Sequence, residues 1–233
     1  MRFVVDPEVF EKLPGVCFGV VTARGVDNAV PVEGIRRILE NNVESVRDRF
    51  MNASVKEAEE LRPYREAMRL VGINPNKFPS SIEALAGRIA KGGRPPFINN
   101  SVALANAVSL SHLLPLGAHD AQALDDDMTV RFSIAGDVFV PFGTDEEERL
   151  EPGELVYTVG HRVKTRRWIW RQSELGKVTE RSSHIFFPID GFRPLNLDRI
   201  TAARDELASR LREYFACDVC TGLVDRDRPD YAF

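Results

Sequence analysis

Residues 101–134 read SVALANAVSLSHLLPLGAHDAQALDDDMTVRFSI, and the spacing of their apolar residues changes at Pro115. Before this proline, the apolar run over 101–114 predicts a buried helix, which ends where proline disfavours helical backbone. After it, residues 129–134 alternate between polar and apolar side chains, which is typical of a half-buried strand. The chain therefore divides near Pro115 into a helical first half and a strand-rich second half.

The same periodicities extend outward in both directions. Towards the N-terminus we expect a buried strand over 17–23, helices over 33–50 and 54–71 with a break at Pro63, and a helix capped by Ser80. Towards the C-terminus we expect strands over 138–141, 154–159, 162–170 and 185–189, then a closing helix from Asp198. Helices followed by strands favour an α+β fold with a mostly antiparallel sheet. No linker divides the chain, so we expect a single domain over residues 1–233.

The composition is that of an ordinary globular protein. The chain has 233 residues, of which 43% are hydrophobic and 28% charged, and its net charge is −4. This excludes collagen-like, disordered and disulfide-stapled proteins, and any nucleic-acid contact must come from a local basic patch. No apolar run approaches the ~20 residues of a membrane span. Asp6 and Pro7 interrupt the N-terminal run that a signal peptide would need. We therefore expect a cytoplasmic protein that does not contact a membrane.

One basic patch lies in residues 162–171, which carry five cations, two tryptophans and no acidic residue. In an extended strand, alternate residues of this stretch share one face. Basic groups beside flat aromatic rings suit a phosphate backbone and an unstacked base, which predicts RNA binding. A solvated edge strand anchored by its tryptophans is the competing interpretation. The predicted RNA-binding residues are Arg162, Lys164, Arg166 and Arg167.

The familiar signatures of nucleotide binding, metal binding and nucleophilic catalysis are absent from the sequence. Cys217 and Cys220 form one Cys-x-x-Cys pair near the expected end of the last helix, but a zinc site needs a second pair of ligands. Small buried side chains are the simpler interpretation of these cysteines. The acidic runs at 125–127 and 145–148 are typical of solvated turns. We therefore expect no metal and no cofactor.

Short motifs follow one another between residues 64 and 182, and their order carries more information than any one of them. They are YREAMRLVGINP (64–75), PSSIEAL (79–85), INNSVALANAVSL (98–110), LPLGAHD (114–120), PGELVY (152–157), TRRWIWRQ (165–172) and VTERS (178–182). The series resembles the B3/B4 domain, the tRNA-editing domain of the phenylalanyl-tRNA synthetase beta subunit, and is most similar to its free-standing relatives. The resemblance covers roughly residues 60–190, which we take as the diagnostic core.

The resemblance implies a compact α+β domain with a pocket in its sheet. In the synthetase, that pocket receives the 3′ end of a mischarged tRNA and hydrolyses its ester to tyrosine. Water attacks there, helped by positioned polar groups and a ribose hydroxyl, without a covalent nucleophile, a metal or a cofactor. The chain lacks the length and the motifs of a tRNA ligase, so the resemblance implies a deacylase that edits aminoacyl-tRNA in trans. The alternative is a non-catalytic module that binds RNA or an aminoacyl-like ligand in the same pocket.

Two positions depart from the family pattern. Ala105 stands where the pattern has threonine, and Gly117 stands where it has histidine. Both changes remove a polar group that positions water or substrate, which favours the non-catalytic alternative. His119 faces the same way as Gly117 in extended backbone, so its imidazole can take the place of the missing histidine. A structural histidine that is hydrogen-bonded to Asp120 or to a loop is the other interpretation.

The resemblance distributes the candidate site over three segments. We expect His119, Asn106 and Ser109 to take part in catalysis, with His119 orienting the attacking water. Asn106 and Ser109 lie three residues apart and share a helix face, although Asn106 could instead tie the helix to the sheet. The predicted substrate-binding residues are Asn100, Gly117, Asp120, Arg167, Trp168 and Arg171.

Overall fold

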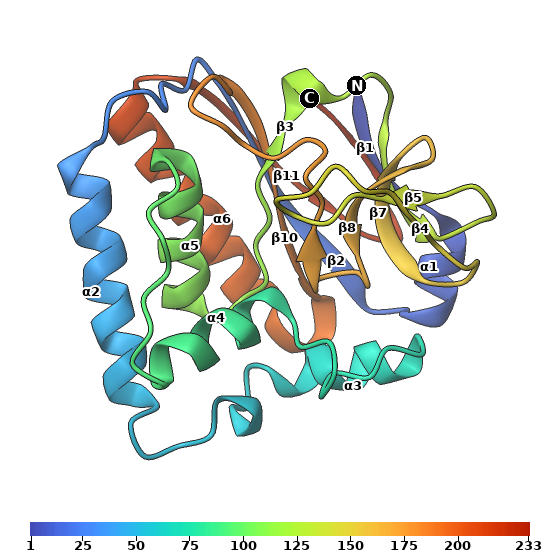
Figure 1. Cartoon of the computed structure of the whole chain (residues 1–233), viewed down its shortest axis with the longest axis horizontal. Helices are drawn as coiled ribbons and strands as arrows, with labels where there is room; N and C mark the ends of the chain where they lie inside the picture. The colour runs from blue at the N-terminus through green and yellow to red at the C-terminus, as the bar shows by residue number, and fades with distance from the viewer.

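The computed structural model describes residues 1–233 as two β-sheets beside a layer of helices (Figure 1). The larger sheet consists of β1 (Arg2–Val5), β4 (Met128–Phe132), β5 (Val138–Phe139), β6 (Glu148–Arg149), β7 (Leu155–Val159), β8 (Arg162–Arg166), β9 (Arg171–Gln172) and β12 (Asp230–Ala232). Their spatial order is β12-β1-β4-β7-β8-β5-β6, and β9 pairs with β8. Only β1 with β4 and β5 with β8 pair in parallel.

The smaller sheet is antiparallel throughout. It contains β2 (Val16–Arg24), β3 (His119–Asp120), β10 (His184–Phe192) and β11 (Asp218–Val224). The order is β11-β2-β10-β3, and the central pair runs in register from His184 opposite Arg24 to Phe192 opposite Val16. The prediction of an α+β fold with mostly antiparallel pairing is confirmed.

Six helices complete the fold. They are α1 (Pro7–Lys12), α2 (Glu33–Arg49), α3 (Arg62–Leu70), α4 (Ser81–Ala90), α5 (Asn100–His112) and α6 (Arg193–Phe215), with 3₁₀ turns η1 (Val55–Glu57) and η2 (Ala121–Ala123). The predicted cap of α4 is present, because the Ser80 hydroxyl accepts the Glu83 amide at 3.3 Å. Helix α6 packs on β2 and β10, and α5 lies between α2 and α6 (Figure 1).

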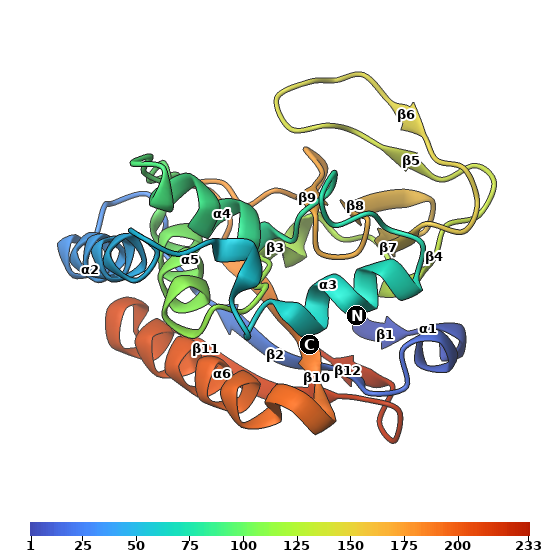
Figure 2. The ribbon, with the colours of Figure 1, turned by 90° about the horizontal axis from the view of Figure 1, so that it is seen from below.

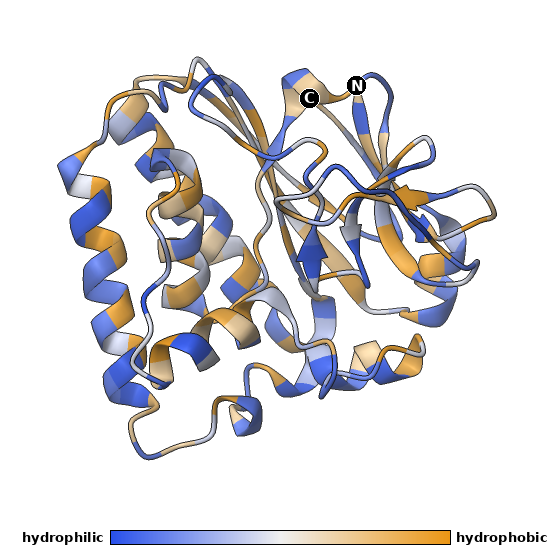
Figure 3. Cartoon of the chain, in the orientation of Figure 1, coloured by the Kyte–Doolittle hydropathy of each residue, from blue (hydrophilic) through white to orange (hydrophobic).

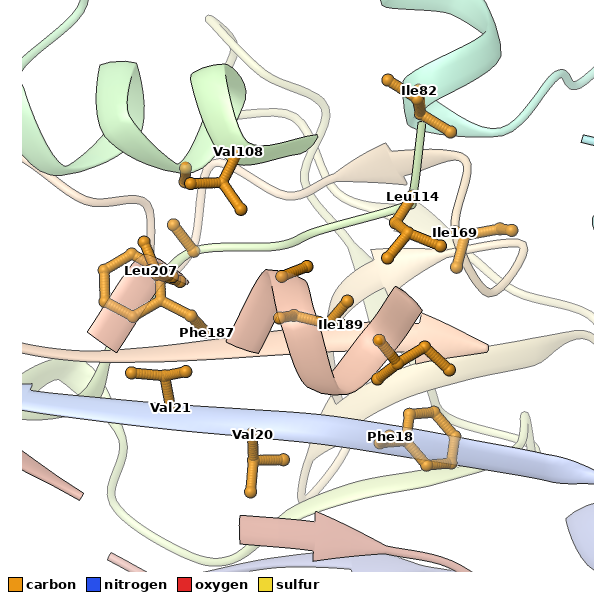
Figure 4. Close-up of a cluster of buried hydrophobic side chains, with 14 of the residues drawn as sticks. Phe18, Val20, Val21, Ile82, Val108, Leu114, Ile169, Phe187, Ile189 and Leu207 are labelled. Atoms are coloured by element: carbon orange, nitrogen blue, oxygen red, sulfur yellow. The ribbon is translucent and has the colours of Figure 1, made fainter. Parts of the chain in front are cut away.

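Apolar side chains from both layers meet in one core. Figure 4 shows Val108 of α5 and Leu207 of α6 near Phe187 and Ile189 of β10. Aromatic rings join the two sheets, since the Phe3 ring of β1 lies 5.4 Å from that of Phe18 on β2. The outer helices turn polar faces to solvent, as the hydropathy colours of α2 show (Figure 3).

Several predicted boundaries are wrong. The chain does not close on a helix, because β11 and β12 follow α6 and complete both sheets. Residues 54–71 were expected to form a helix with a break at Pro63, but they form the 3₁₀ turn η1 followed by α3. Pro63 lies in the first turn of α3, so a new helix begins at the predicted break. The last helix begins at Arg193 instead of Asp198, with a kink at Asn196 whose amide oxygen accepts the Phe192 amide. The strand β1 was not predicted.

The strand expected over 162–170 is also wrong in its second half. Strand β8 ends at Arg166, and the next two residues, Arg167 and Trp168, have φ values of 50° and 60°. Such left-handed backbone reverses the chain, so alternate residues from 164 to 170 do not share a face. The turn is held by its contacts, because the Trp168 amide donates to the Leu155 carbonyl at 2.6 Å.

No helix of the fold is both long enough and apolar enough to cross a membrane.

Candidate active site

A small cavity, here called the chamber, lies between the end of α5, the turn after β8 and strand β10. Its volume is about 80 Å³, and residues within 115–119, 165–172 and 188–190 line it together with Ser81 and Tyr157. Segment 115–119 is fixed against β10 by backbone hydrogen bonds from Gly117 to Pro188 and from Asp190 to Pro115. The chamber therefore sits at the edge of the smaller sheet, where it meets the larger one.

A wider cavity, here called the outer cleft, adjoins the chamber. Its volume is about 390 Å³, and α4, α5 and the β5–β6 hairpin contribute to its walls. That hairpin stands away from the body of the molecule (Figure 2). Five residues line both cavities and are called the neck: Ser81, Leu116, Trp170, Arg171 and Gln172. The site is thus a chamber that communicates through the neck with an open cleft.

Asp190 is a buried acid on the chamber wall. Its Oδ1 accepts hydrogen bonds from the Tyr157 hydroxyl at 2.6 Å and the Trp168 indole at 2.7 Å. Burial raises the pKa of this carboxyl to about 7, although both hydrogen bonds act to lower it. An acid with a displaced pKa in a cavity is a frequent mark of function. The sequence analysis missed Asp190, and the available signal was a single acid in the otherwise apolar run 185–192.

His119 lines the same chamber and is 2% exposed. Its ring stacks on Tyr157 at 6.1 Å, and its Nδ1 is buried without a hydrogen-bond partner. Burial lowers the pKa of the imidazole to about 3, with a smaller contribution from Lys164, so the ring is neutral at physiological pH. The predicted hydrogen bond from His119 to Asp120 or a loop is not formed. A side chain on Gly117 would place its Cβ 3.2 Å from His119 Nε2, so the glycine leaves room for the ring.

The neutrality of His119 can be measured directly. We expect its ring carbon-bound proton to keep a constant NMR chemical shift between about pH 5 and 8, because burial disfavours the imidazolium. The signal is assigned by comparison with His119→Asn. A titration midpoint near 6.5 for this signal would show that the ring is hydrated and that the chamber is open to water.

The structure brings most of the predicted catalytic segments together. Asn106 and Ser109 share one face of α5 and line the outer cleft, as their spacing predicted. The Ser109 hydroxyl donates to the Leu114 carbonyl at 2.6 Å, so it also fixes the end of the helix. Gly117 and Trp168 line the chamber. Asn106 and Ser109 therefore line the outer cleft, whereas His119 lines the chamber.

Asn100 and Asp120 line neither cavity. The Asn100 amide is fully buried, where its oxygen accepts the Val32 amide and its nitrogen donates to the Val30 carbonyl. It thereby ties the start of α5 to the loop before α2. The Asp120 carboxylate accepts a hydrogen bond from Ser182 and caps the turn η2. Both contacts hold backbone segments in place.

The basic residues of 162–167 are largely neutralised by carboxylates. Arg162 pairs with Asp125, while Arg166 pairs with Glu148 at 2.5 Å and with Glu154 at 2.9 Å. The Arg167 guanidinium lies 3.4 Å from Glu154 and 3.8 Å from the centre of the Phe78 ring. Lys164 is 2% exposed, and burial lowers the pKa of its amine. Binding of RNA by these four residues stays a prediction.

Two other arginines remain exposed at the site. Arg171 belongs to the neck, and its guanidinium lies 5.2 Å from the centre of the Trp170 ring. Arg88 projects from α4 into the outer cleft. Neither lies within 4 Å of a carboxylate oxygen, which leaves both cations available to an anionic ligand at the mouth of the site. Arg171 was among the predicted residues and Arg88 was not.

The cysteines lie apart from this site. Cys217 lies two residues after the end of α6, near the end of the last helix as predicted. The interpretation of the pair as small buried side chains is wrong, because Cys217 is only half-buried and Cys220 is an exposed residue of β11. Nowhere does the structure gather three or more histidine, cysteine or acidic side chains that could hold a metal ion.

The chain was compared with known families and structures. The sequence model of the B3/4 domain matches residues 63–221. The chain is similar in structure to an N-terminal fragment of the phenylalanyl-tRNA synthetase beta subunit from Pyrococcus horikoshii, with a TM-score of 0.50 and 10% sequence identity. The superposition covers 93% of this chain and 49% of that fragment, so the chain spans about half the fragment's length. None of the curated proteins that were compared matches the chain.

The structural likeness, at this low identity, shows the fold alone. The family match covers more than half of the chain and begins near the start of the core that the motifs indicated. It continues through α6 into β11, beyond the region of the motifs. That residues 1–233 form one such domain as a whole stays a prediction. The resemblance drawn from the motifs is confirmed, and the chain belongs to the B3/4 domain family.

Proposed function

We propose that the protein binds the aminoacylated 3′ end of a tRNA and hydrolyses the ester of a wrongly attached amino acid in trans. The observation that carries this proposal is the two-compartment site. A neutral, unpartnered histidine and a buried acid line a small chamber, which opens through the neck into a cleft with two exposed arginines. Such a site suits a ligand with a small polar end and an anionic body.

The outer cleft fits the terminal nucleotide. Its volume of about 390 Å³ lies in the usual range for small-molecule sites, roughly 300–1,000 Å³. Arg88 and Arg171 supply positive charge for a phosphate, and Asn106 offers an amide to the ribose. Phe142, which is 51% exposed, and Trp170 present aromatic surface on which a base can stack.

The ester would lie at the neck, with the amino acid in the chamber. Arg171 lines both cavities, so its guanidinium can donate to the carbonyl oxygen as that oxygen gains charge during attack. The nucleophile is water, which needs neither a metal nor a cofactor. His119 orients this water by hydrogen bonding as a neutral ring, since a pKa of about 3 makes it a poor proton acceptor.

We expect His119→Ala to lower the deacylation rate by ~10²-fold, the size of loss that follows when a reacting group is no longer held in position. The affinity for tRNA should stay nearly unchanged, because His119 lies in the chamber and not in the outer cleft. Added imidazole should restore part of the rate by entering the vacated space. An equal rate in the variant and the parent would make His119 structural.

The deciding experiment is a deacylation screen of the purified protein against tRNAs that carry different amino acids. Release of one amino acid above the spontaneous rate, and its loss in His119→Ala, would support the proposal. Tight binding of tRNA without hydrolysis across the panel would favour the alternative, a non-catalytic module that binds RNA or an aminoacyl-like ligand. A tRNA substrate also implies a cytoplasmic location, which cell fractionation tests.

Two positions of the sequence favour that alternative. Gly117 lines the chamber without offering a polar side chain. Ala105 is 3% exposed in α5 and lines neither the chamber nor the outer cleft, so its methyl group lies in the core. Catalysis therefore depends on His119 more heavily than it would with a polar side chain at position 117, whereas position 105 lies outside both cavities.

A further inference from the structure

We infer that the chamber selects a small amino acid that bears a hydroxyl group, serine or threonine, and excludes aromatic amino acids. The inference rests on the proposed function, since it assigns the amino acid whose ester would be hydrolysed. Two independent features of the chamber carry it: its size, and the polar groups on its walls.

The size of the chamber excludes an aromatic ring. An apolar protein cavity of about 150 Å³ holds benzene. The chamber, at about 80 Å³, has roughly half that volume and also has to admit the atoms next to the ester. Its walls are stiff, because Trp168 and Tyr157 are almost fully buried and both are hydrogen-bonded to Asp190. Pro188 of β10, whose carbonyl accepts the Gly117 amide, closes another side.

The walls also carry polar atoms that an apolar occupant would leave unpaired. Tyr157 and Trp168 both donate to Oδ1 of Asp190, and no side chain donates to Oδ2, so Oδ2 can still bond to a ligand in the chamber. His119 and Thr165, which both carry polar side chains, line the same cavity. Leaving a buried donor or acceptor unpaired is costly, so a site of this kind rejects a ligand that lacks the matching polar group.

A hydroxyl is the group that suits Asp190 in either protonation state. Because the pKa of Asp190 is raised to about 7, the carboxylate and the neutral acid are both populated near neutral pH. A hydroxyl donates to the carboxylate and accepts from the acid. A methyl group, as in alanine, satisfies neither form. The chamber is therefore expected to distinguish serine from alanine, which differ by one oxygen atom.

The test uses one tRNA transcript charged in separate reactions with serine, threonine, alanine, phenylalanine or tyrosine, so that only the amino acid varies. We expect kcat/KM for the serine ester, after subtraction of spontaneous hydrolysis, to exceed that for alanine by ~10-fold or more. The phenylalanine and tyrosine esters should be slower than serine by ~10²-fold or more. Hydrolysis of threonine should resemble that of serine.

Two substitutions separate the roles of size and polarity. Leu116→Ala widens the neck and should raise the rate for the phenylalanine ester relative to serine by ~10-fold. The matched control is Leu70→Ala, since Leu70 is 73% exposed on α3 and should leave the ratio unchanged. Asp190→Ala should bring the serine-to-alanine ratio close to one, while Asp190→Asn, which keeps a polar group, should retain the preference.

The outcomes distinguish this inference from the function on which it rests. Fastest hydrolysis of the tyrosine or phenylalanine ester would overturn the inference and leave the proposed deacylase standing. Equal rates for serine and alanine in the parent would overturn the role of Asp190. No hydrolysis of any of the five esters would overturn the proposed function, and the inference with it. If Asp190→Ala does not fold, the parent's serine-to-alanine ratio and Leu116→Ala still decide.

Discussion

Replacing Asp190 with asparagine is expected to stabilise the protein at pH 8 by on the order of 4 kcal/mol. Burial raises the pKa of Asp190 from 3.8 to about 7, a difference of about 3 pK units, each worth ~1.36 kcal/mol. The parent must therefore keep a disfavoured charge buried above pH 7. Asparagine cannot ionise, and its amide oxygen can still accept the hydrogen bonds from Tyr157 and Trp168.

The sign of this effect depends on pH. Below about pH 4, Asp190 is protonated in both the folded and the unfolded chain, so replacing it with asparagine does not raise the free energy of unfolding. Between about pH 4 and 7 the unfolded chain ionises while the folded chain holds its proton, and the stability of the parent falls as pH rises. The advantage of Asp190→Asn should grow across this window and level off above it. Urea unfolding of both proteins at a series of pH values measures the difference.

Asp225 provides the matched control, since it is also a buried aspartate. Burial acts to raise the pKa of its carboxyl, but hydrogen bonds from Arg193 and the backbone of Arg228 outweigh burial and lower the pKa. Asp225→Asn should therefore destabilise the protein at pH 8, with a cost that shrinks as pH falls through the native pKa. An Asp190→Asn variant that is less stable than its parent at pH 8, or a difference independent of pH, would contradict the environment described for Asp190.

The elements that the sequence predicted well are those specified by local signals. Ser80 with Glu83 marks the start of α4, and Pro63 marks the start of α3. The alternation over 129–134 gives β4, because one face of that strand packs on the core. Strands β3 and β9 have two residues each and exist only through pairing with distant segments, so no local pattern indicates them.

The site was predictable in its segments but not in its chemistry. The segment around His119 could be found by motif. Asp190 could not, because its pKa depends on contacts with Trp168 and Tyr157, which lie 22 and 33 residues away in sequence. An acid within an apolar strand is a signal only once its burial is known. The turn that points Trp168 inward depends on left-handed backbone at two non-glycine residues, which sequence patterns disfavour.

The basic stretch illustrates a second limit. Residues 162–167 contain no acid, so their charge looked available to RNA. The carboxylates that pair with Arg162 and Arg166 come from Asp125, Glu148 and Glu154, which approach only when β8 joins its neighbours. Charge along a sequence therefore overstates the charge that a folded surface offers. At the mouth of this site, the exposed cations are Arg88 and Arg171.

Arg171→Gln is expected to lower kcat for deacylation by ~10²–10³-fold, the usual effect of removing one donor to a developing oxyanion. Arg171 lies in the neck, where the proposed function places the ester carbonyl. Glutamine keeps an N–H donor, but its side chain is shorter and lacks the charge and the forked geometry of the guanidinium. The loss should appear in kcat more than in KM, because the interaction strengthens only as the carbonyl oxygen gains charge. Single-turnover deacylation of a charged tRNA, with the enzyme in excess, measures it.

Arg88→Gln separates this role from phosphate binding. Arg88 lines the outer cleft and does not line the chamber, so its loss should weaken tRNA binding and leave the rate of the bound complex nearly unchanged. The dependence of log affinity on log salt should become shallower by ~0.7, the value for one lost contact with a single strand. Arg69→Gln removes the same charge from an exposed position on α3 and should change neither quantity. If Arg171→Gln alters only affinity and its salt dependence, as expected for Arg88→Gln, then Arg171 holds a phosphate and the ester lies elsewhere than the neck.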